Sequence, residues 1–284
     1  MQERIEARLK TFGGALGVAA IDLKTGEQIA VNADARYPTA SLIKVPVMVE
    51  VYHQIAAGAL RRDTTVTVGE RDKVGDESVV LNQLHGGLVV SVADLLALMT
   101  AYSDNTATNL LIGLVGTAKV DERMVGYGLT ETKLFRPTFR DGRADLLPEL
   151  EREFGLGMTT PREMAKLFAL IAEGKIVNRA LSDEMIALLA TQQDRQMIPR
   201  SLPFETADIL VANKTGWDAE KNPDAKGFRG DVRNDAAYVK LPKARYVIAI
   251  CARRIKDTSA TADNETFKVG AEISRMVYDR FNGR

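Results

Sequence analysis

The chain has 284 residues, of which 45% are hydrophobic and 6% aromatic, and its 38 Lys and Arg residues balance its 38 Asp and Glu residues. This length permits one large domain or two lobes around a sizeable core. Because the formal net charge is zero, the composition favours neither nucleic acid nor an anionic membrane as a partner. No apolar run approaches the length that is needed to span a bilayer.

The first part of the chain predicts a helix, a hairpin and a second helix. Residues 2–12 have an amphipathic helical pattern. Residues 15–22 and 27–32 predict two strands around the turn Lys24-Thr25-Gly26-Glu27. A longer helix is expected over residues 40–59. The apolar residues that recur there at helical spacing are Val45, Val47, Met48, Val51 and Tyr52.

Helical patterns dominate the middle of the chain, about residues 60–205. Ser91 is a cap-like residue before one predicted helix, and a second helix is expected from near Thr106 to Val115. Another should follow Thr160, because Pro161 and Glu163 suit a first turn. Ser182 is the predicted cap of one more helix.

The last part of the chain predicts strands over 208–213, 235–240 and 246–252, followed by an amphipathic helix over 262–281. Strands at both ends with helices between them predict an α/β (α+β) fold. We expect a mixed lobe, residues 1–59 and 206–284, with an antiparallel sheet flanked by N- and C-terminal helices. Residues 60–205 would form an inserted all-α lobe.

The few cysteine and histidine residues exclude several kinds of site. Cys251 is the only cysteine and lies in an apolar run, so we expect a buried thiol and no internal disulfide. The two histidines are His53 and His85. His53 lies about three turns beyond Ser41 on the same predicted helix and cannot reach it. A Ser-His-Asp triad and a zinc site with histidine ligands are therefore not expected.

Three short motifs indicate chemistry at a serine. In Ser41-Leu42-Ile43-Lys44, helical spacing would put Ser41 and Lys44 on one face. A lysine with a lowered pKa can take the proton of a serine. S-x-x-K is short and common, and on its own it favours an N-cap serine with an exposed lysine. However, Ser103-Asp104-Asn105 follows in a polar break between predicted helices, and Lys214-Thr215-Gly216 ends a predicted strand.

With these three motifs in order, the chain resembles the class A β-lactamase-like serine hydrolases of the β-lactamase and penicillin-binding-protein superfamily. The longer strings from Tyr102 to Leu111 and from Arg233 to Asp235 also resemble that family. The resemblance covers nearly the whole chain. It implies a site at the junction of the two lobes and an acyl-serine mechanism without a metal or other cofactor.

The resemblance also implies catalytic roles. Ser41 would attack the β-lactam carbonyl, and Lys44 would accept or relay its proton. Ser103 would pass a proton toward the departing ring nitrogen, assisted by Lys214. The oxyanion hole would be formed by the backbone N–H groups of Ser41 and Trp217.

Further residues would bind the substrate. Asn105 would donate to or accept from the side-chain amide of the substrate and help to hold Lys44, although it could also be only a helix cap. The substrate carboxylate would be bound by Thr215 and Arg233. Gly216 belongs to the same motif as Thr215 and is counted with the substrate-binding residues. Arg233 could instead pair with a surface acid. Asp104 and the side chain of Trp217 are expected to have structural roles.

The pattern departs from the family at the residue that activates the hydrolytic water. Class A β-lactamases carry a glutamate in an E-x-x-L-N pattern, which this chain lacks, and tend to have an arginine two residues earlier. Aligning on Arg143 puts Asp145 at the glutamate position. Aligning on Pro148-Glu149-Leu150 puts Leu147 there and Glu151 at the asparagine position.

The candidates for a deacylation base are therefore Asp145, Glu149 and Glu151, but we expect all three to be ordinary solvated charges. A positioned general base contributes about 10²–10⁴-fold. We therefore expect β-lactams to acylate Ser41 and hydrolysis to be weak. The charged segment 217–231 predicts an extended hairpin loop, which either narrows access to the site or is a surface ornament.

The sequence thus predicts a serine hydrolase that opens a β-lactam through an acyl-serine. The alternatives are a penicillin-binding D-Ala-D-Ala peptidase-like enzyme or an esterase with the same serine and lysines, and a silent binding domain, against which the intact motifs argue. The expected partner is a β-lactam or a peptidoglycan-like acyl substrate, and the expected state is a monomer. The charged start of the chain does not resemble a secretory signal. We expect a periplasmic or secreted protein whose signal has been removed, with a cytoplasmic protein as the alternative.

Overall fold

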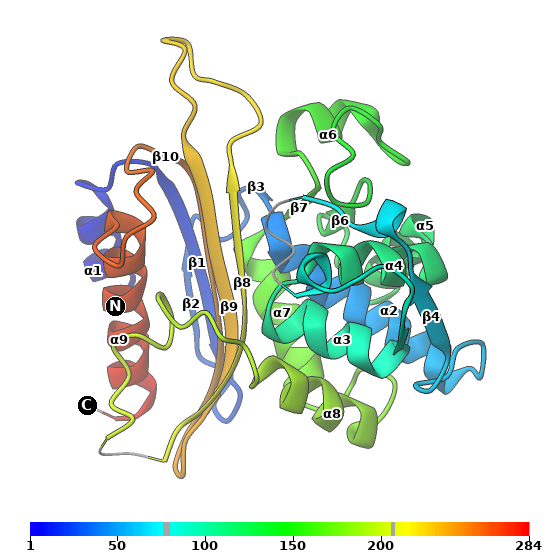
Figure 1. Ribbon diagram of the computed structural model, residues 1–284. Helices are drawn as coiled ribbons and strands as arrows, with labels where there is room; N and C mark the ends of the chain where they lie inside the picture. Colours follow the sequence, from blue (N-terminus) through cyan, green and yellow to red (C-terminus); the bar gives the residue numbers. More distant parts are fainter. Residues whose placement is uncertain (76–79, 206–207, 284) are drawn as a thin grey trace.

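A five-stranded antiparallel sheet forms one side of the molecule (Figure 1). The computed structural model describes residues 1–75, 80–205 and 208–283. The strand order is β2-β1-β10-β9-β8, so strands from both ends of the chain lie together, as the sequence predicted. The strands are β1 (Ala15–Asp22), β2 (Gln28–Val31), β8 (Leu210–Ala219), β9 (Asp231–Lys240) and β10 (Arg245–Ile255).

The two faces of the sheet belong to different hydrophobic clusters because side chains alternate along each strand. Val239 and Ile248 pack with residues of α1 (Gln2–Leu9) and α9 (Glu265–Phe281). Val247 and Cys251 pack with the helical block on the opposite face. Figure 1 shows α1 and α9 on one side of the sheet and the other helices on the other side. Cys251 is fully buried, as predicted, and burial raises the pKa of its thiol.

The helical block is built around α2 (Lys44–Ala56), whose first nine residues are all buried. Helix α7 (Pro161–Ala172) packs against β1, β9 and β10 and so joins this block to the sheet. Ser91 and Thr160 cap α3 and α7 as predicted, because their hydroxyls accept from the backbone N–H groups of Asp94 and Glu163. The remaining helices are α3 (Val92–Ala101), α4 (Asn105–Val115), α5 (Thr117–Gly126), α6 (Pro148–Phe154) and α8 (Arg179–Leu189).

The inserted segment differs from the predicted all-α lobe because it also contains strands. β4 (Thr65–Val68) pairs with β5 (Leu88–Ser91). A small sheet joins β3 (Tyr37–Pro38), β7 (Gly157–Thr159) and β6 (Lys133–Leu134). The predicted cap Ser182 is also wrong: α8 is capped by Asn178, and Ser182 lies inside the helix, where its hydroxyl donates to the carbonyl of Ile176.

The predicted loop 217–231 is shorter than expected, because β8 and β9 continue into it as a paired hairpin. This hairpin projects at the same end of the molecule as α6 (Figure 1). Within the described part of the chain, no helix has both the length and the apolar character that a membrane crossing requires.

Candidate active site

Ser41 lies in a short 3₁₀ turn, Ala40–Ile43, rather than in the first turn of an α-helix. Lys44 is the first residue of α2, directly after this turn. Ala40 has a φ of 44°, in the left-handed region that residues other than glycine rarely adopt. Such backbone strain is often found at functional sites. The turn leaves Ser41 half-buried at the surface of a cleft.

Two buried lysines meet at the hydroxyl of Ser103. Nζ of Lys44 lies 2.9 Å from Ser103 Oγ and donates to the Ser103 carbonyl at 2.6 Å. Nζ of Lys214, on β8, lies 3.1 Å from the same Oγ. Ser103 has a φ of 59°. The structure therefore brings together residues from all three motifs, which are far apart in the chain.

Asn105 and Asp104 hold this arrangement in place. Oδ1 of Asn105 accepts from Lys44 Nζ at 2.8 Å. Asp104 is fully buried, and its carboxylate accepts from the backbone N–H groups of Ala107 and Leu81. Asp104 caps α4, so its structural role agrees with the expectation from the sequence.

Burial lowers the pKa of Lys214 to about 8, although the negative charges of Asp194 and Asp235 oppose this shift. Burial also raises the pKa of Asp235 to about 8, against the hydrogen bonds that it accepts from Asn213 and from the backbone N–H of Ile198. Lys214 loses its charge only as the pH rises through about 8.

The glycine of the Lys214-Thr215-Gly216 motif is required by a close backbone approach. A Cβ at Gly216 would lie 2.6 Å from the carbonyl oxygen of Thr39 and 2.8 Å from the backbone nitrogen of Leu42. Strand β8 therefore runs directly against the turn that carries Ser41. Asn234, on β9, donates to the carbonyls of Pro38 and Thr39, both at 2.9 Å, and fastens the residues before Ser41 to the sheet.

The cleft at Ser41 consists of two hollows of about 320 Å³ and 140 Å³. Both hollows are lined by Ser41, Asn105 and Trp217. The larger hollow is also lined by Tyr102, Ser103, Asp194 and Thr215. The smaller hollow is also lined by Arg136, Thr138, Phe139 and Asp141. No motif in the sequence predicted Asp194 or these four residues of the smaller hollow as part of the site.

Arg233 does not line either hollow but lies behind Trp217, which lines both. Its side chain is 1% exposed, and its Nη2 donates to Asp231 Oδ2 at 2.9 Å and to the carbonyl of Ser259 at 2.8 Å. Its guanidinium is stacked on the rings of Trp217 and Phe267. This placement differs from the substrate contact that the resemblance implied, because the guanidinium is enclosed by aromatic rings and an internal acid.

The three carboxylates that were candidates for a deacylation base also lie elsewhere. Asp145 accepts from the hydroxyl of Thr117 at 2.8 Å and lines a different cavity. Glu149 is exposed and pairs with Arg152 in the same helix. Glu151 is buried against Arg136, whose Nε lies 2.9 Å from its Oε1.

Thr138 lines the cleft at Ser41, which none of those three carboxylates does. Thr138 follows Arg136 by two residues, which is the spacing typical of the family, and it lines the hollow that contains Ser41. Asn109 fixes Thr138 by accepting from its backbone N–H at 2.8 Å and donating to its carbonyl at 3.1 Å. Aligning the family arginine on Arg136, rather than on Arg143, puts Thr138 at the glutamate position.

The hairpin between β8 and β9 is fastened to the loop that carries Thr138. Nζ of Lys221 lies 2.9 Å from Asp141 Oδ1 and 3.4 Å from Glu151 Oε1. Burial by itself raises the pKa of Glu151, but the hydrogen bond from Arg136 and the charge of Lys221 outweigh it and lower the pKa. Asn222 donates to the carbonyl of Arg152 at 2.7 Å.

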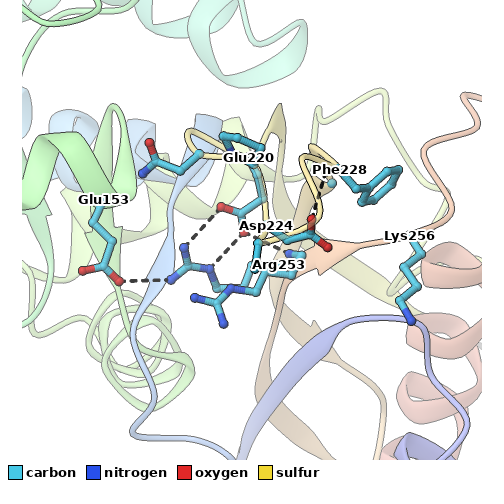
Figure 2. A pocket seen from close by; sticks show the side chains of 11 residues that line it. Glu153, Glu220, Asp224, Phe228, Arg253 and Lys256 are labelled. Carbon is cyan, nitrogen blue, oxygen red and sulfur yellow. Dashed lines mark hydrogen bonds and ion pairs between the residues drawn. The ribbon is translucent and has the colours of Figure 1, made fainter.

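A second ionic group joins the base of the hairpin to β10 and α6. Figure 2 shows Arg253 between Glu220 and Glu153, at the wall of a pocket of about 370 Å³. Arg253 Nε donates to Glu220 at 2.9 Å, and its Nη1 lies 3.6 Å from Glu153. The hairpin is therefore attached to its surroundings on two sides.

Comparisons with known proteins show the family to which the chain belongs. A family model described as "Beta-lactamase enzyme family" matches residues 1–281. Beta-lactamase AST-1 of Nocardia asteroides is 30% identical over 96% of this chain and 81% of its own, and Beta-lactamase CARB-3 of Pseudomonas aeruginosa is 22% identical over 96% and 88%.

Solved structures have the same fold. The beta-lactamase from Sphaerobacter thermophilus DSM 20745 is 28% identical, with a TM-score of 0.82 over 100% of this chain and 97% of its own. PBP-A is 24% identical and has a TM-score of 0.81 over 100% of this chain and 96% of its own, which shows that the two proteins have a similar fold. The chain belongs to the beta-lactamase enzyme family and is a serine β-lactamase-like hydrolase.

Proposed function

We propose that this protein opens the amide of a β-lactam by forming an acyl-enzyme at Ser41. The observation that carries this proposal is the convergence of Lys44 and Lys214 on the hydroxyl of Ser103, in the cleft that Ser41 lines. A nucleophile, a base and a path for protons are what acyl transfer from an amide requires.

In the proposed acylation step, the Oγ of Ser41 forms a bond to the lactam carbonyl carbon, and the C–N bond of the ring breaks. Lys44, as the free amine, takes the proton of Ser41. Its hydrogen bond to Ser103 provides a route by which a proton reaches the ring nitrogen through the Ser103 hydroxyl. Lys214 supports this relay with its charged form, because its Nζ lies within hydrogen-bond distance of the same hydroxyl.

Backbone geometry around Gly216 supports the proposed oxyanion hole. The approach of β8 to the 3₁₀ turn brings the strand to the backbone nitrogen of Ser41, 3.1 Å from where a Cβ of Gly216 would lie. The backbone N–H groups of Ser41 and Trp217 would stabilise the developing oxyanion. We propose that Thr215, rather than Arg233, contacts the substrate carboxylate, because Thr215 lines the larger hollow.

Deacylation should be slow. We propose that Thr138 stands at the position of the glutamate that activates water in class A enzymes; its hydroxyl lies 3.0 Å from Asn109 Oδ1. A hydroxyl is a far weaker base than a carboxylate at neutral pH. The same observation favours the second candidate function, a penicillin-binding D-Ala-D-Ala peptidase-like enzyme that acts on peptidoglycan-like substrates.

Time-resolved mass spectrometry with benzylpenicillin tests this function, with Ser41→Ala as the matched control. The wild-type protein should gain the full mass of the drug within minutes and lose it slowly, while Ser41→Ala should gain nothing. Rapid product formation without a persistent adduct would contradict slow deacylation. Neither adduct nor product in a folded wild-type protein would reject acyl transfer from β-lactams.

A further inference from the structure

Three half-exposed aromatic side chains border the cleft at Ser41. Tyr102, Phe139 and Trp217 are 48%, 50% and 51% exposed. Single exposed apolar residues are common on protein surfaces, but exposed aromatics that gather at one cleft indicate a binding surface. Tyr102 lines the larger hollow, Phe139 lines the smaller one, and Trp217 lines both.

The indole of Trp217 is held in place from behind. The guanidinium carbon of Arg233 lies 4.4 Å from the centre of the indole and 4.7 Å from the ring of Phe267 on α9. Asp231 links the two residues, since its Oδ2 accepts from Arg233 Nη2 at 2.9 Å and from Trp217 Nε1 at 3.4 Å. The exposed ring at the cleft is thus part of a stack that continues to the C-terminal helix.

The hydrogen bonds of Arg233 fit a stacking role. Within the described part of the chain, its Nε and Nη1 are buried and have no hydrogen-bond partner. Buried polar atoms without partners are rare and need an explanation. Here two aromatic rings enclose the guanidinium, and attraction between a cation and a ring partly replaces the missing bonds.

We propose that Arg233 is a positioning residue that holds Trp217 as an apolar wall of the cleft, so that the enzyme prefers acyl substrates with an aryl group on the acyl side. This inference rests on the proposed acyl transfer to Ser41. The evidence for an aryl-binding site is the smaller hollow, a space of about 140 Å³ that Phe139 and Trp217 line together with Ser41 and Asn105. A flat ring placed there would lie beside both aromatic side chains, and contacts between aromatic rings are favourable in edge or offset arrangements.

The first test compares two penicillins that differ only in the acyl side chain. Benzylpenicillin carries a phenylacetyl group, and 6-acetamidopenicillanic acid carries an acetyl group in its place. Acylation of the wild-type protein should be faster with the phenylacetyl compound by about 2- to 30-fold, the range expected for aromatic and cation–ring contacts. Equal acylation by the two compounds would overturn the inference, whereas no adduct from either would reject the acyl transfer on which it rests.

Two variants assign the preference to the stack. Arg233→Lys keeps a charge beside Asp231 but lacks the planar guanidinium, and Trp217→Leu leaves the buried arginine in place. Both should bring the ratio of the two acylation rates close to one. Arg275→Lys is the matched control, because Arg275 lies over Tyr278 at 5.5 Å on α9, and it should keep the wild-type ratio. An unchanged ratio in Trp217→Leu would contradict the proposal.

The methyl ester of benzylpenicillin separates the stack from a direct contact with the substrate carboxylate. If Arg233 acts through Trp217, Arg233→Lys should slow the acid and its ester by the same factor. A loss that appears with the acid and disappears with the ester would show that Arg233 binds the carboxylate, and would overturn the positioning role.

The stack can also be observed without any substrate. Trp217 is the only tryptophan in the chain, so the intrinsic fluorescence reports on this one indole. Arg233→Lys should shift the emission to longer wavelength and increase quenching by acrylamide, because the ring gains solvent and mobility. An emission spectrum and a quenching constant equal to those of the wild type would contradict the positioning role, whatever the activity shows.

Discussion

The ammonium of Lys214 on strand β8 lies 3.1 Å from the hydroxyl of Ser103, which directly precedes the cap of helix α4. One residue belongs to the sheet and the other to the helical block, so the proposed proton path exists only while these parts of the molecule are packed together. Two residues contribute to that packing. Gly216 leaves room for the turn at Ser41 to approach the sheet, and Asn234 donates a hydrogen bond to that turn.

Replacement of Ser103 by Ala tests the proton path. The change removes the oxygen that Lys44 and Lys214 share, and acylation by benzylpenicillin should fall by about 10²–10⁴-fold. Stopped-flow or mass-spectrometric acylation rates measure this loss. Ser201→Ala, in a loop far along the chain, is the control and should acylate at the wild-type rate. A loss below threefold in Ser103→Ala would remove Ser103 from the path.

The pH dependence of acylation should report on Lys214. Burial lowers the pKa of this lysine to about 8, so its charged form dominates below pH 8 and falls about tenfold per unit above it. If the charged form supports the relay, the acylation rate falls as the pH rises through about 8. In Lys214→Arg the side chain stays charged up to about pH 12. The acylation rate of this variant should be lower but should not fall as the pH rises through about 8. Identical profiles for the two proteins would contradict the role of Lys214.

A carboxylate at position 138 should turn slow deacylation into turnover. Thr138→Glu places the base at the family position, in the hollow that Ser41 lines, and the deacylation rate should rise by about 10²–10⁴-fold. Thr138→Gln has nearly the same size and no base, so it is the matched control. The measurement is the decay of the acyl-enzyme by mass spectrometry. Equal decay in the two variants would show that position 138 does not face the hydrolytic water.

The attachment of the hairpin should contribute to stability. Lys221→Met removes partly exposed ion pairs with Asp141 and Glu151 and should lower the free energy of unfolding by about 1 kcal/mol. Glu151→Gln removes the buried carboxylate from Arg136, which keeps its ion pair with the exposed Asp141, and should cost about 3 kcal/mol. Lys226→Met, near the tip of the same hairpin, should change stability by less than about 0.5 kcal/mol. Urea unfolding measures all three, and equal effects of Lys221→Met and Lys226→Met would contradict the attachment.

The sequence predicted the strands of the large sheet and most helices, because alternating and helical patterns are local signals. The meeting of the three motifs was implied by the resemblance to the family. However, the sequence predicted an α-helix at Ser41, where the structure has a 3₁₀ turn with strain at Ala40. Backbone strain of this kind depends on β8 and Asn234 packing against the turn. Those contacts join residues about 175 to 195 positions apart, and no local pattern reports them.

The loop residues were the hardest to assign from sequence. Asp145, Glu149 and Glu151 were candidates because they are acids near the expected position, yet the structure uses Glu151 to neutralise Arg136. Arg136 and Thr138 have the two-residue spacing of the family, but Thr138 is not an acid. The presence of a carboxylate therefore could not mark this position in the sequence. Arg233 was assigned by motif to the substrate, whereas its burial under Trp217 depends on Phe267, which comes from the final helix.

The most direct measurement is the location and stoichiometry of the drug adduct. After brief incubation with benzylpenicillin, the wild-type protein is digested and its peptides are mapped by mass spectrometry. The account predicts one drug molecule per chain, on the peptide that contains Ser41, and none on Ser41→Ala. An adduct on another residue, or a folded wild-type protein that takes up no drug, would contradict it.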